Sequence, residues 1–175
     1  IVDILNENFS LMADVYDVPE DEAAPIQLQN PKMFASAEGV LESFGLPGKG
    51  EMDPTTPMAI FYIFLFGLML SDAAYGLIIF LACFILIKKF PKMESGLQKS
   101  LRLFMYCGIS TLIWGILFGG FFGDLITVVS RTFFHHEVTF EPVWFAPLDD
   151  PMKLLLFSLL FGLIHLFGGL ALKGY

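Results

Sequence analysis

The sequence lacks the features of a nucleic-acid-binding protein and of an enzyme site. Only 10 of its 175 residues are lysine or arginine, and they form no basic stripe that could replace the counterions of a nucleic acid. A glycine-rich phosphate loop, a nucleophile elbow and a zinc-binding helix motif are all missing. We therefore expect no nucleic-acid partner, no cofactor and no catalysis by this chain itself.

Cysteines and metal-ligand clusters are also scarce. The two cysteines, Cys83 and Cys107, lie in apolar runs, where cysteine is typical of a small buried residue and says little about redox compartment. His135, His136 and Glu137 are adjacent in sequence but have no recognisable third or fourth partner, so we expect no metal site. No signal peptide is recognised, because the first apolar run begins after residue 55 and is too long.

Apolar residues are abundant instead. They make up 55% of the chain, the mean hydropathy is +0.68, and 20 residues are phenylalanine. Three long runs are nearly free of charge, at residues 58–87, 103–129 and 152–172. Because about 20 apolar residues suffice for one spanning helix, the sequence predicts an all-α membrane protein. We expect a helical hairpin plus two long transmembrane helices, preceded by a short, partly helical N-terminal segment.

Charge divides the chain into two parts. Residues 1–53 hold 11 of the 18 acidic residues and only 2 of the 10 basic ones, whereas residues 54–175 are nearly neutral. We interpret residues 1–53 as the end of a cytoplasmic domain and its hinge, with a helix that Asn30-Pro31 opens and Gly45 ends. Residues 54–175 form the membrane part. Because the chain starts with Ile1 and stops abruptly at Tyr175, we expect a piece of a longer protein.

The first apolar run is compatible with more than one topology. Residues 58–87 are too long for one untilted span and short for two, and Ser71 and Asp72 interrupt them. The positive-inside rule places the cations that follow the run in the cytoplasm: Lys88, Lys89, Lys92, Lys99 and Arg102. This rule disfavours one helix with the N-terminal segment inside. It leaves a hairpin, or one helix with that segment outside.

Three polar residues of the membrane part are candidates for an ion or proton path. Asp72 and Asp124 are acids at or near membrane depth, and His165 lies in the middle of the last run. A capping role is the alternative for the two acids, and a structural hydrogen bond is the alternative for the histidine. Small residues predict close helix packing. Gly115, Gly119 and Gly123 recur every four residues, and Ser158, Gly162, His165 and Gly169 make a similar face on the last run.

Several motifs together carry a resemblance to a known family. The stretch NPKMFASAEGVLESFGLPGKGEMDPTTPMAIFYIFLFGLMLSDAAYGLIIF resembles the membrane entry of subunit I of V/A-type ATP synthases, the counterpart of vacuolar ATPase subunit a. WGILFGGFFGD and FAPLDDPMKLLLFSLLFGLIHLFGGLALKGY are similar to later parts of that subunit. The likeness covers residues 28–175. It departs from the family pattern at Thr56, an added residue, and at Ser71 and Ala74, which replace glycines.

The resemblance implies a non-catalytic membrane stator subunit of a rotary ATPase that translocates protons or sodium ions. In that family a cytoplasmic arm binds the peripheral stalks, and eight membrane helices face the c-ring. An even number of membrane helices favours the hairpin. An arginine in a later helix separates two half-channels, and neither Arg102 nor Arg131 matches it. The chain would then be the scaffold half of a multi-pass protein of a prokaryotic plasma membrane, with its N-terminal segment cytoplasmic. An independent transporter or channel with a re-entrant hairpin, and a simple membrane anchor, are the alternatives.

Overall fold

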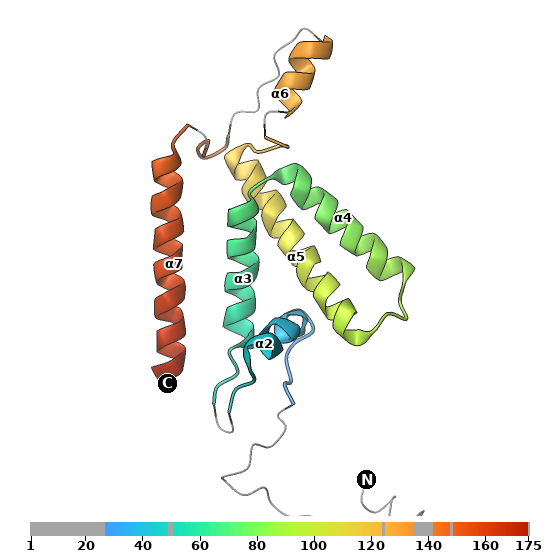
Figure 1. Ribbon diagram of the computed structural model, residues 1–175, viewed down its shortest axis with the longest axis vertical. Coiled ribbons are helices and arrows are strands. Elements are labelled where there is room, and N and C mark those ends of the chain that lie inside the picture. The colour runs from blue at the N-terminus through green and yellow to red at the C-terminus, as the bar shows by residue number, and fades with distance from the viewer. Residues whose placement is uncertain (1–26, 49–50, 124, 135–141, 148, 175) are drawn as a thin grey trace, which may run out of the picture.

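The structure is a computed structural model that describes residues 27–48, 51–123, 125–134, 142–147 and 149–174. Within these residues every regular element is a helix, as predicted (Figure 1). In chain order they are η1 (Phe34–Ala37), α2 (Glu38–Phe44), α3 (Thr55–Leu70), α4 (Ala73–Lys89), α5 (Ser95–Phe118), α6 (Leu125–Val129), the π-helical turn η2 (Ser130–Phe134) and α7 (Pro151–Gly174). The predicted helix before Gly45 is confirmed as η1 and α2, and Gly45 follows with a φ of 122°.

The first apolar run is a hairpin. Helix α3 ends at Leu70, Ser71 adopts a left-handed conformation with a φ of 38°, and α4 begins at Ala73. Figure 1 shows that the chain runs up α3 to this turn and back down α4, and that α5 lies between the two helices. The predicted hairpin is therefore confirmed, and one continuous helix across residues 58–87 is wrong.

The second apolar run differs from its prediction. Helix α5 begins at Ser95, before the apolar residues, and ends at Phe118 rather than continuing to residue 129. Gly119 ends it with a φ of 71°, and Phe122 and Gly123 also have positive φ values of 53° and 63°. Because positive φ values interrupt a right-handed helix, the chain turns here, and residues 125–129 form the separate helix α6.

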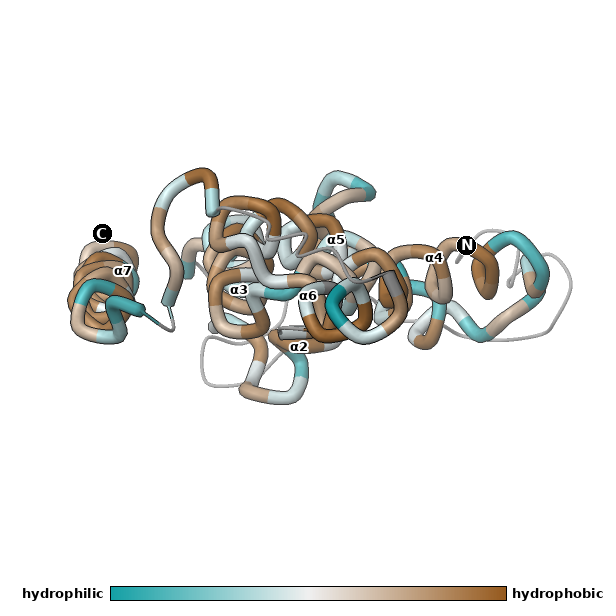
Figure 2. Tube along the Cα trace, turned by 90° about the horizontal axis from the view of Figure 1, so that it is seen from above, coloured by the Kyte–Doolittle hydropathy of each residue, from teal (hydrophilic) through white to brown (hydrophobic). Residues whose placement is uncertain are grey.

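Among the described residues, two helices are long and apolar enough to cross a membrane, α5 and α7, each of 24 residues. At a rise of about 1.5 Å per residue they measure about 36 Å, more than the hydrocarbon thickness of a bilayer. Helix α3 is apolar but shorter, at 16 residues. Figure 2 shows α7 at one side of the molecule and coloured mostly as apolar. None of its residues is buried, although the rings of Phe161 and His165 pack against α3.

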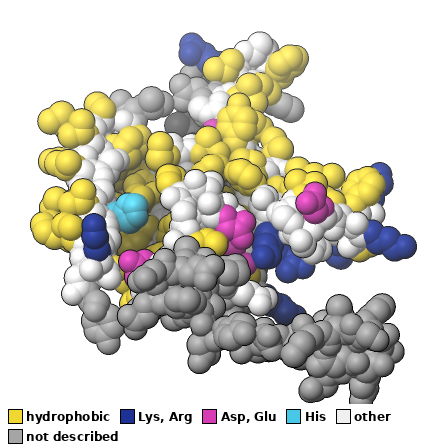
Figure 3. All heavy atoms as spheres, turned by 60° about the horizontal axis from the view of Figure 1, so that its bottom comes forward, with side chains coloured by type: hydrophobic (Ala, Val, Ile, Leu, Met, Phe, Trp, Pro, Cys, Tyr) yellow, Lys and Arg dark blue, Asp and Glu magenta, His cyan; other side chains and the backbone are white. Residues whose placement is uncertain are grey.

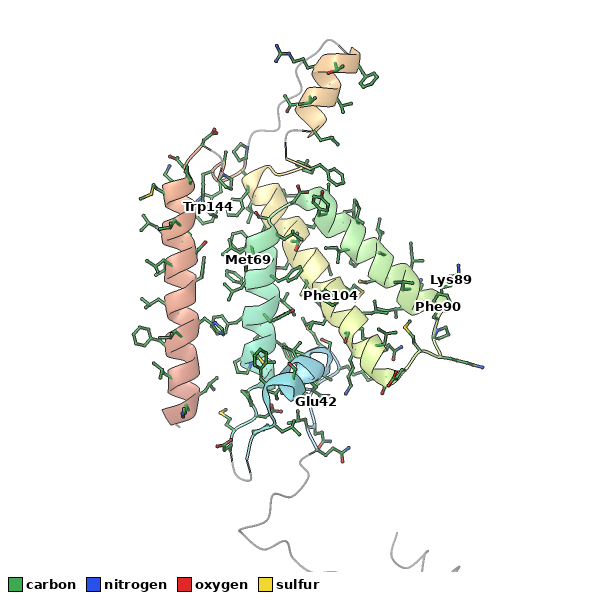
Figure 4. All side chains as sticks on the ribbon, viewed as in Figure 1. Glu42, Met69, Lys89, Phe90, Phe104 and Trp144 are labelled. Atoms are coloured by element: carbon green, nitrogen blue, oxygen red, sulfur yellow. The ribbon has the colours of Figure 1, made fainter. Side chains whose placement is uncertain are left out.

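The helices pack around two apolar clusters, one at each end of the bundle. We call the end where η1 and α2 pack the arm end, and the end that holds the Ser71–Asp72 turn the turn end. The arm-end cluster is built on Ala37, Ala59, Leu103 and Cys107. The turn-end cluster is built on Leu68, Trp114, Phe118 and Phe145. The aromatic loop before α7 contributes to the second cluster, because the Trp144 ring stacks 6.0 Å from Phe118 and packs 4.6 Å from Phe157 (Figure 4).

Candidate functional site: the packed hairpin turn and the polar junction

Helices α4 and α5 approach so closely that their backbones touch at glycines. A methyl group on Gly115 would lie 2.0 Å from the Ala73 nitrogen, and one on Gly76 would lie 2.4 Å from the Leu112 nitrogen. A methyl group on Gly108 would meet the α4 backbone at 2.8 Å. Real side-chain atoms do not approach backbone so closely, so only glycine fits at these positions. The pair α4–α5 is therefore held at a fixed, short separation.

Asp72 fixes the turn end of this pair. Its carboxylate oxygen Oδ1 accepts hydrogen bonds from the backbone nitrogens of Ala74 at 2.9 Å and Tyr75 at 3.2 Å, which caps the first turn of α4. The Gly123 nitrogen donates to the other oxygen, Oδ2, at 3.3 Å, and the Ala73 nitrogen donates to the Gly120 carbonyl at 2.8 Å. Two hydrogen bonds thus join the hairpin turn to the loop that follows α5, one from Gly123 to the Asp72 carboxylate and one between the backbones of Ala73 and Gly120.

The predicted glycine face is divided by the end of α5. Gly115 lies within the helix and contacts α4, but Gly119 and Gly123 lie beyond its last residue in left-handed conformations. At those two positions glycine allows the turn, which differs from the continuous packing face that the four-residue period predicts. Gly162 and Gly169 of α7 have no described neighbour within 4 Å of an added methyl group, so close packing there stays a prediction.

Of the three predicted polar residues the structure describes Asp72 and His165, and these two lie far apart. Asp72 is at the turn end, whereas the ring of His165 packs 4.7 Å from that of Phe61, which lies about 16 Å further toward the arm end along α3. His165 lines a small pocket of about 270 Å³ that Met58 and Gly168 also border. Asp124 lies outside the described residues, as does the trio His135, His136 and Glu137. The predicted role of Asp124 in an ion or proton path stays a prediction.

Replacing Asp72 by alanine is expected to destabilise the protein by about 1 kcal/mol, because the cap of α4 is lost. Asp72→Asn keeps an oxygen acceptor and is expected to cost only a few tenths of that amount. Thermal unfolding of the detergent-solubilised full-length protein measures both. Equal losses for alanine and asparagine would show that the negative charge, and not the cap, is what the fold requires.

A polar junction ties the arm end to the membrane helices. It consists of Asn30, Glu38, Asp53, Thr55 and Lys99. The Lys99 ammonium lies 2.7 Å from the Glu38 carboxylate, and the Asn30 amide donates to Glu38 at 3.3 Å and to Asp53 at 2.8 Å. Asp53 in turn accepts from the backbone nitrogen of Thr55 at 2.9 Å and from its hydroxyl, which places the carboxylate at the first turn of α3. One amide therefore links α2, the start of α3 and, through Glu38, the start of α5.

Sequence reasoning missed this junction and two of the packing glycines. In the sequence Asn30 and Asp53 stand within longer motifs, and Lys99 stands among the cations of a loop, so nothing local marks them as partners. For the glycines a signal exists, because Ala73, Gly76 and Cys83 on α4 recur at spacings of three and seven, and Gly108 and Gly115 on α5 are seven apart. Such a repeat places small residues on one face of each helix.

Burial raises the pKa of the Asp53 carboxyl, but the hydrogen bonds from Thr55 and Asn30 lower it by more, so it lies below its ordinary value of 3.8. The carboxylate then contributes stability that is present above the ordinary pKa and is lost as the pH falls through the lowered one. We expect wild-type protein to lose stability on acidification from about pH 5 to about pH 3 by more than Asp53→Asn does.

Unfolding midpoints of the full-length protein across that pH range measure this difference. The matched control is Glu42→Gln, since Glu42 is exposed on α2 and outside the junction (Figure 4). It is expected to keep the wild-type slope. Parallel curves for wild type and Asp53→Asn would contradict a role for the ionised Asp53 in the junction.

The described residues define an all-α membrane protein built on a helical hairpin. No family model matches the chain. A-type ATP synthase subunit I of Thermococcus kodakarensis is 34% identical to it over 153 residues, 87% of this chain and 23% of that protein. The subunit I of Methanocaldococcus jannaschii is 34% identical over 176 residues, which cover 88% of this chain and 25% of that protein. V-type ATP synthase subunit I 2 of Treponema pallidum is 30% identical over 113 residues, 63% of this chain and 25% of that protein.

The predicted resemblance is therefore confirmed: the chain is homologous to a stretch of subunit I of the A-type and V-type ATP synthases. It spans about a quarter of the length of these relatives.

Proposed function

We propose that this chain is the end of the cytoplasmic arm and the first half of the membrane bundle of a rotary-ATPase stator subunit. The observation that carries the proposal is the similarity to A-type ATP synthase subunit I, which extends over 87% of the chain. Residues 1–53 would be the end of the arm and its hinge, and residues 54–175 the membrane half. The subunit would hold its complex against the rotating c-ring while protons or sodium ions cross, without catalysing ATP chemistry itself.

The polar junction supports this role. A stator must resist torque where its cytoplasmic arm meets the membrane, and a junction with one ion pair and four hydrogen bonds joins α2 to the starts of α3 and α5. Buried or half-buried polar contacts of this kind fix one orientation, since any sliding would leave a carboxylate unpaired. The arm and the membrane helices would therefore move as one body at this point.

The rigid α4–α5 pair supports a scaffold role within the membrane. Helix α5 contacts both arms of the hairpin, and its backbone touches α4 at Gly76 and Gly115. Neither arginine of the described spans suits the family's channel arginine: Arg102 lies in the first third of α5, and Arg131 lies after α6 in η2. We therefore place the translocation chemistry of the subunit on helices outside this chain.

We further propose that the chain crosses the membrane several times with its N-terminal segment in the cytoplasm. The hairpin puts Gly48 and Gly96 at one end of the bundle and Ala146 at the other (Figure 1). Cysteines placed at Gly48 and Gly96 are expected to react with a membrane-impermeant maleimide only in opened cells, and one at Ala146 in intact cells. The unsubstituted chain is the control, because Cys83 and Cys107 are buried. Labelling of all three sites in intact cells would contradict this topology.

The function itself is tested by purifying the full-length protein from its own membranes in mild detergent. We expect c-ring and peripheral-stalk subunits to copurify with it, and liposomes that carry the full-length protein alone to show no ion flux. A protein that purifies free of ATPase subunits would overturn the proposal. Ion flux from the protein alone would instead favour an independent transporter with a re-entrant hairpin.

A further inference from the structure

An apolar pocket opens between the end of α4 and the start of α5. It has a volume of about 630 Å³, and Leu86, Phe90, Leu97 and Leu101 supply its walls. Lys89 and Lys92 stand at the same pocket, together with the loop around Pro91. Figure 4 shows Lys89 and Phe90 at the tip where α4 passes into α5, at the outer corner of the bundle. The pocket therefore combines apolar walls with two lysine side chains.

The cations at this tip lack acidic partners among the described residues. Lys88, Lys89 and Lys92 are exposed, and no ion pair between described residues includes them. The Lys88 and Lys89 ammonium groups instead lie 4.8 Å and 5.9 Å from the ring centres of Phe84 and Phe90. Figure 3 shows Lys and Arg side chains gathered beside apolar ones at this end. Glu94 is the single acid in residues 88–94, so the tip has a net positive charge.

We propose that this tip binds an anionic phospholipid of the cytoplasmic leaflet, with an acyl chain in the pocket and the phosphate between Lys89 and Lys92. The inference rests on the cytoplasmic placement of the α4–α5 loop proposed above. At that depth the apolar walls meet the acyl region and the lysine heads reach the headgroup layer. Basic pockets between membrane helices on the cytoplasmic side suit acidic headgroups, since each lysine near the surface adds attraction.

An acidic stretch of the chain itself is the competing occupant. Residues 1–26 contain seven acids and no lysine or arginine, so they match the charge of the tip. They match its interior less well, because filling an apolar pocket with an acidic peptide would strip water from carboxylates. A phospholipid satisfies both the charge and the apolar walls with one molecule.

Photolabelling of the full-length protein in its complex tests the proposal. The complex is placed in phosphatidylcholine nanodiscs that contain a trace of phosphatidylglycerol with a photoactivatable acyl chain, or the matching phosphatidylcholine probe. We expect the phosphatidylglycerol probe to label residues 86–101 about tenfold more than the phosphatidylcholine probe does. K89Q/K92Q is expected to abolish this preference. K173Q, which removes a lysine from the same end of the bundle but from α7, is expected to retain it.

A second variant keeps the test independent of the lysines. Leu97→Asp puts a negative charge in the pocket wall and is expected to reduce labelling by phosphatidylglycerol while both lysines remain. Equal labelling by the two probes, or a preference that survives K89Q/K92Q, would overturn the proposal. So would zero-length crosslinks that join Lys89 or Lys92 to residues 1–26 in place of the label. If the full-length protein purifies without ATPase subunits, the stator proposal alone is contradicted. The lipid proposal is tested separately, because the photolabel is read on residues 86–101 of this chain.

Discussion

Gly115→Ala is expected to destabilise the protein by about 1–3 kcal/mol, the usual cost of forcing extra volume into a packed interior. The added methyl group would lie 2.0 Å from the Ala73 nitrogen and 2.6 Å from its α-carbon, so the neighbour that must move is backbone and not a flexible side chain. Movement of Ala73 would also strain its bond to the Gly120 carbonyl and the cap that Asp72 provides. Thermal unfolding of the full-length protein in detergent measures the loss.

Gly96→Ala is the matched control, because Gly96 lies on the same helix and nothing lies within 4 Å of the methyl group that would be added. Alanine has the higher helix propensity by up to about 1 kcal/mol, so this substitution is expected to leave stability unchanged or to raise it slightly. Equal effects of the two substitutions would show that the change in stability at Gly115 follows helix propensity and not the α4–α5 contact. The close approach of the two backbones would then contribute nothing measurable.

The hairpin was predictable because a polar pair interrupts its apolar run. Ser71 and Asp72 favour a turn and an N-cap, and the lysines after residue 87 favour a return to the first side of the membrane. No polar residue marks the end of α5 in the same way. Gly119 sits in a run that stays apolar through residue 123, and glycine is common inside membrane helices, so hydropathy alone extends the span to residue 129. A packing glycine and a helix-ending glycine look alike in sequence.

The polar junction could not be read from the sequence for a different reason. Its contacts join residues 8, 23 and 61 positions apart, so no local pattern records them. Charge counting gave Lys99 a role in topology only, whereas the folded chain pairs it with Glu38. Local patterns predict helices and their ends, but they do not show which polar side chains meet when helices pack. The pairings follow from η1 and α2 docking on α3 and α5 through the arm-end cluster.

Lys99→Met is expected to destabilise the protein more than Glu38→Gln, although both remove the same ion pair. The Glu38 side chain is 8% exposed and that of Lys99 is 43% exposed. Without Lys99, the Asn30 amide at 3.3 Å is the one partner that the buried carboxylate keeps among the described residues, which is expected to cost about 1–3 kcal/mol. Without the Glu38 charge, the Lys99 ammonium is still hydrated, so the expected loss is about 0.5–1 kcal/mol.

The double variant Glu38→Gln/Lys99→Met separates the pair from its surroundings. The double variant removes the charges of both residues, so no buried carboxylate is left without its cation. Its unfolding midpoint is therefore expected to lie close to that of Glu38→Gln and above that of Lys99→Met. A double variant less stable than Lys99→Met would contradict the buried carboxylate as the source of the loss. In the assembled complex the proposed stator role adds a second readout. Loosening the junction with Lys99→Met is expected to reduce ATP-driven ion pumping by more than ATP hydrolysis, because the arm would yield under torque before the catalytic subunits were affected.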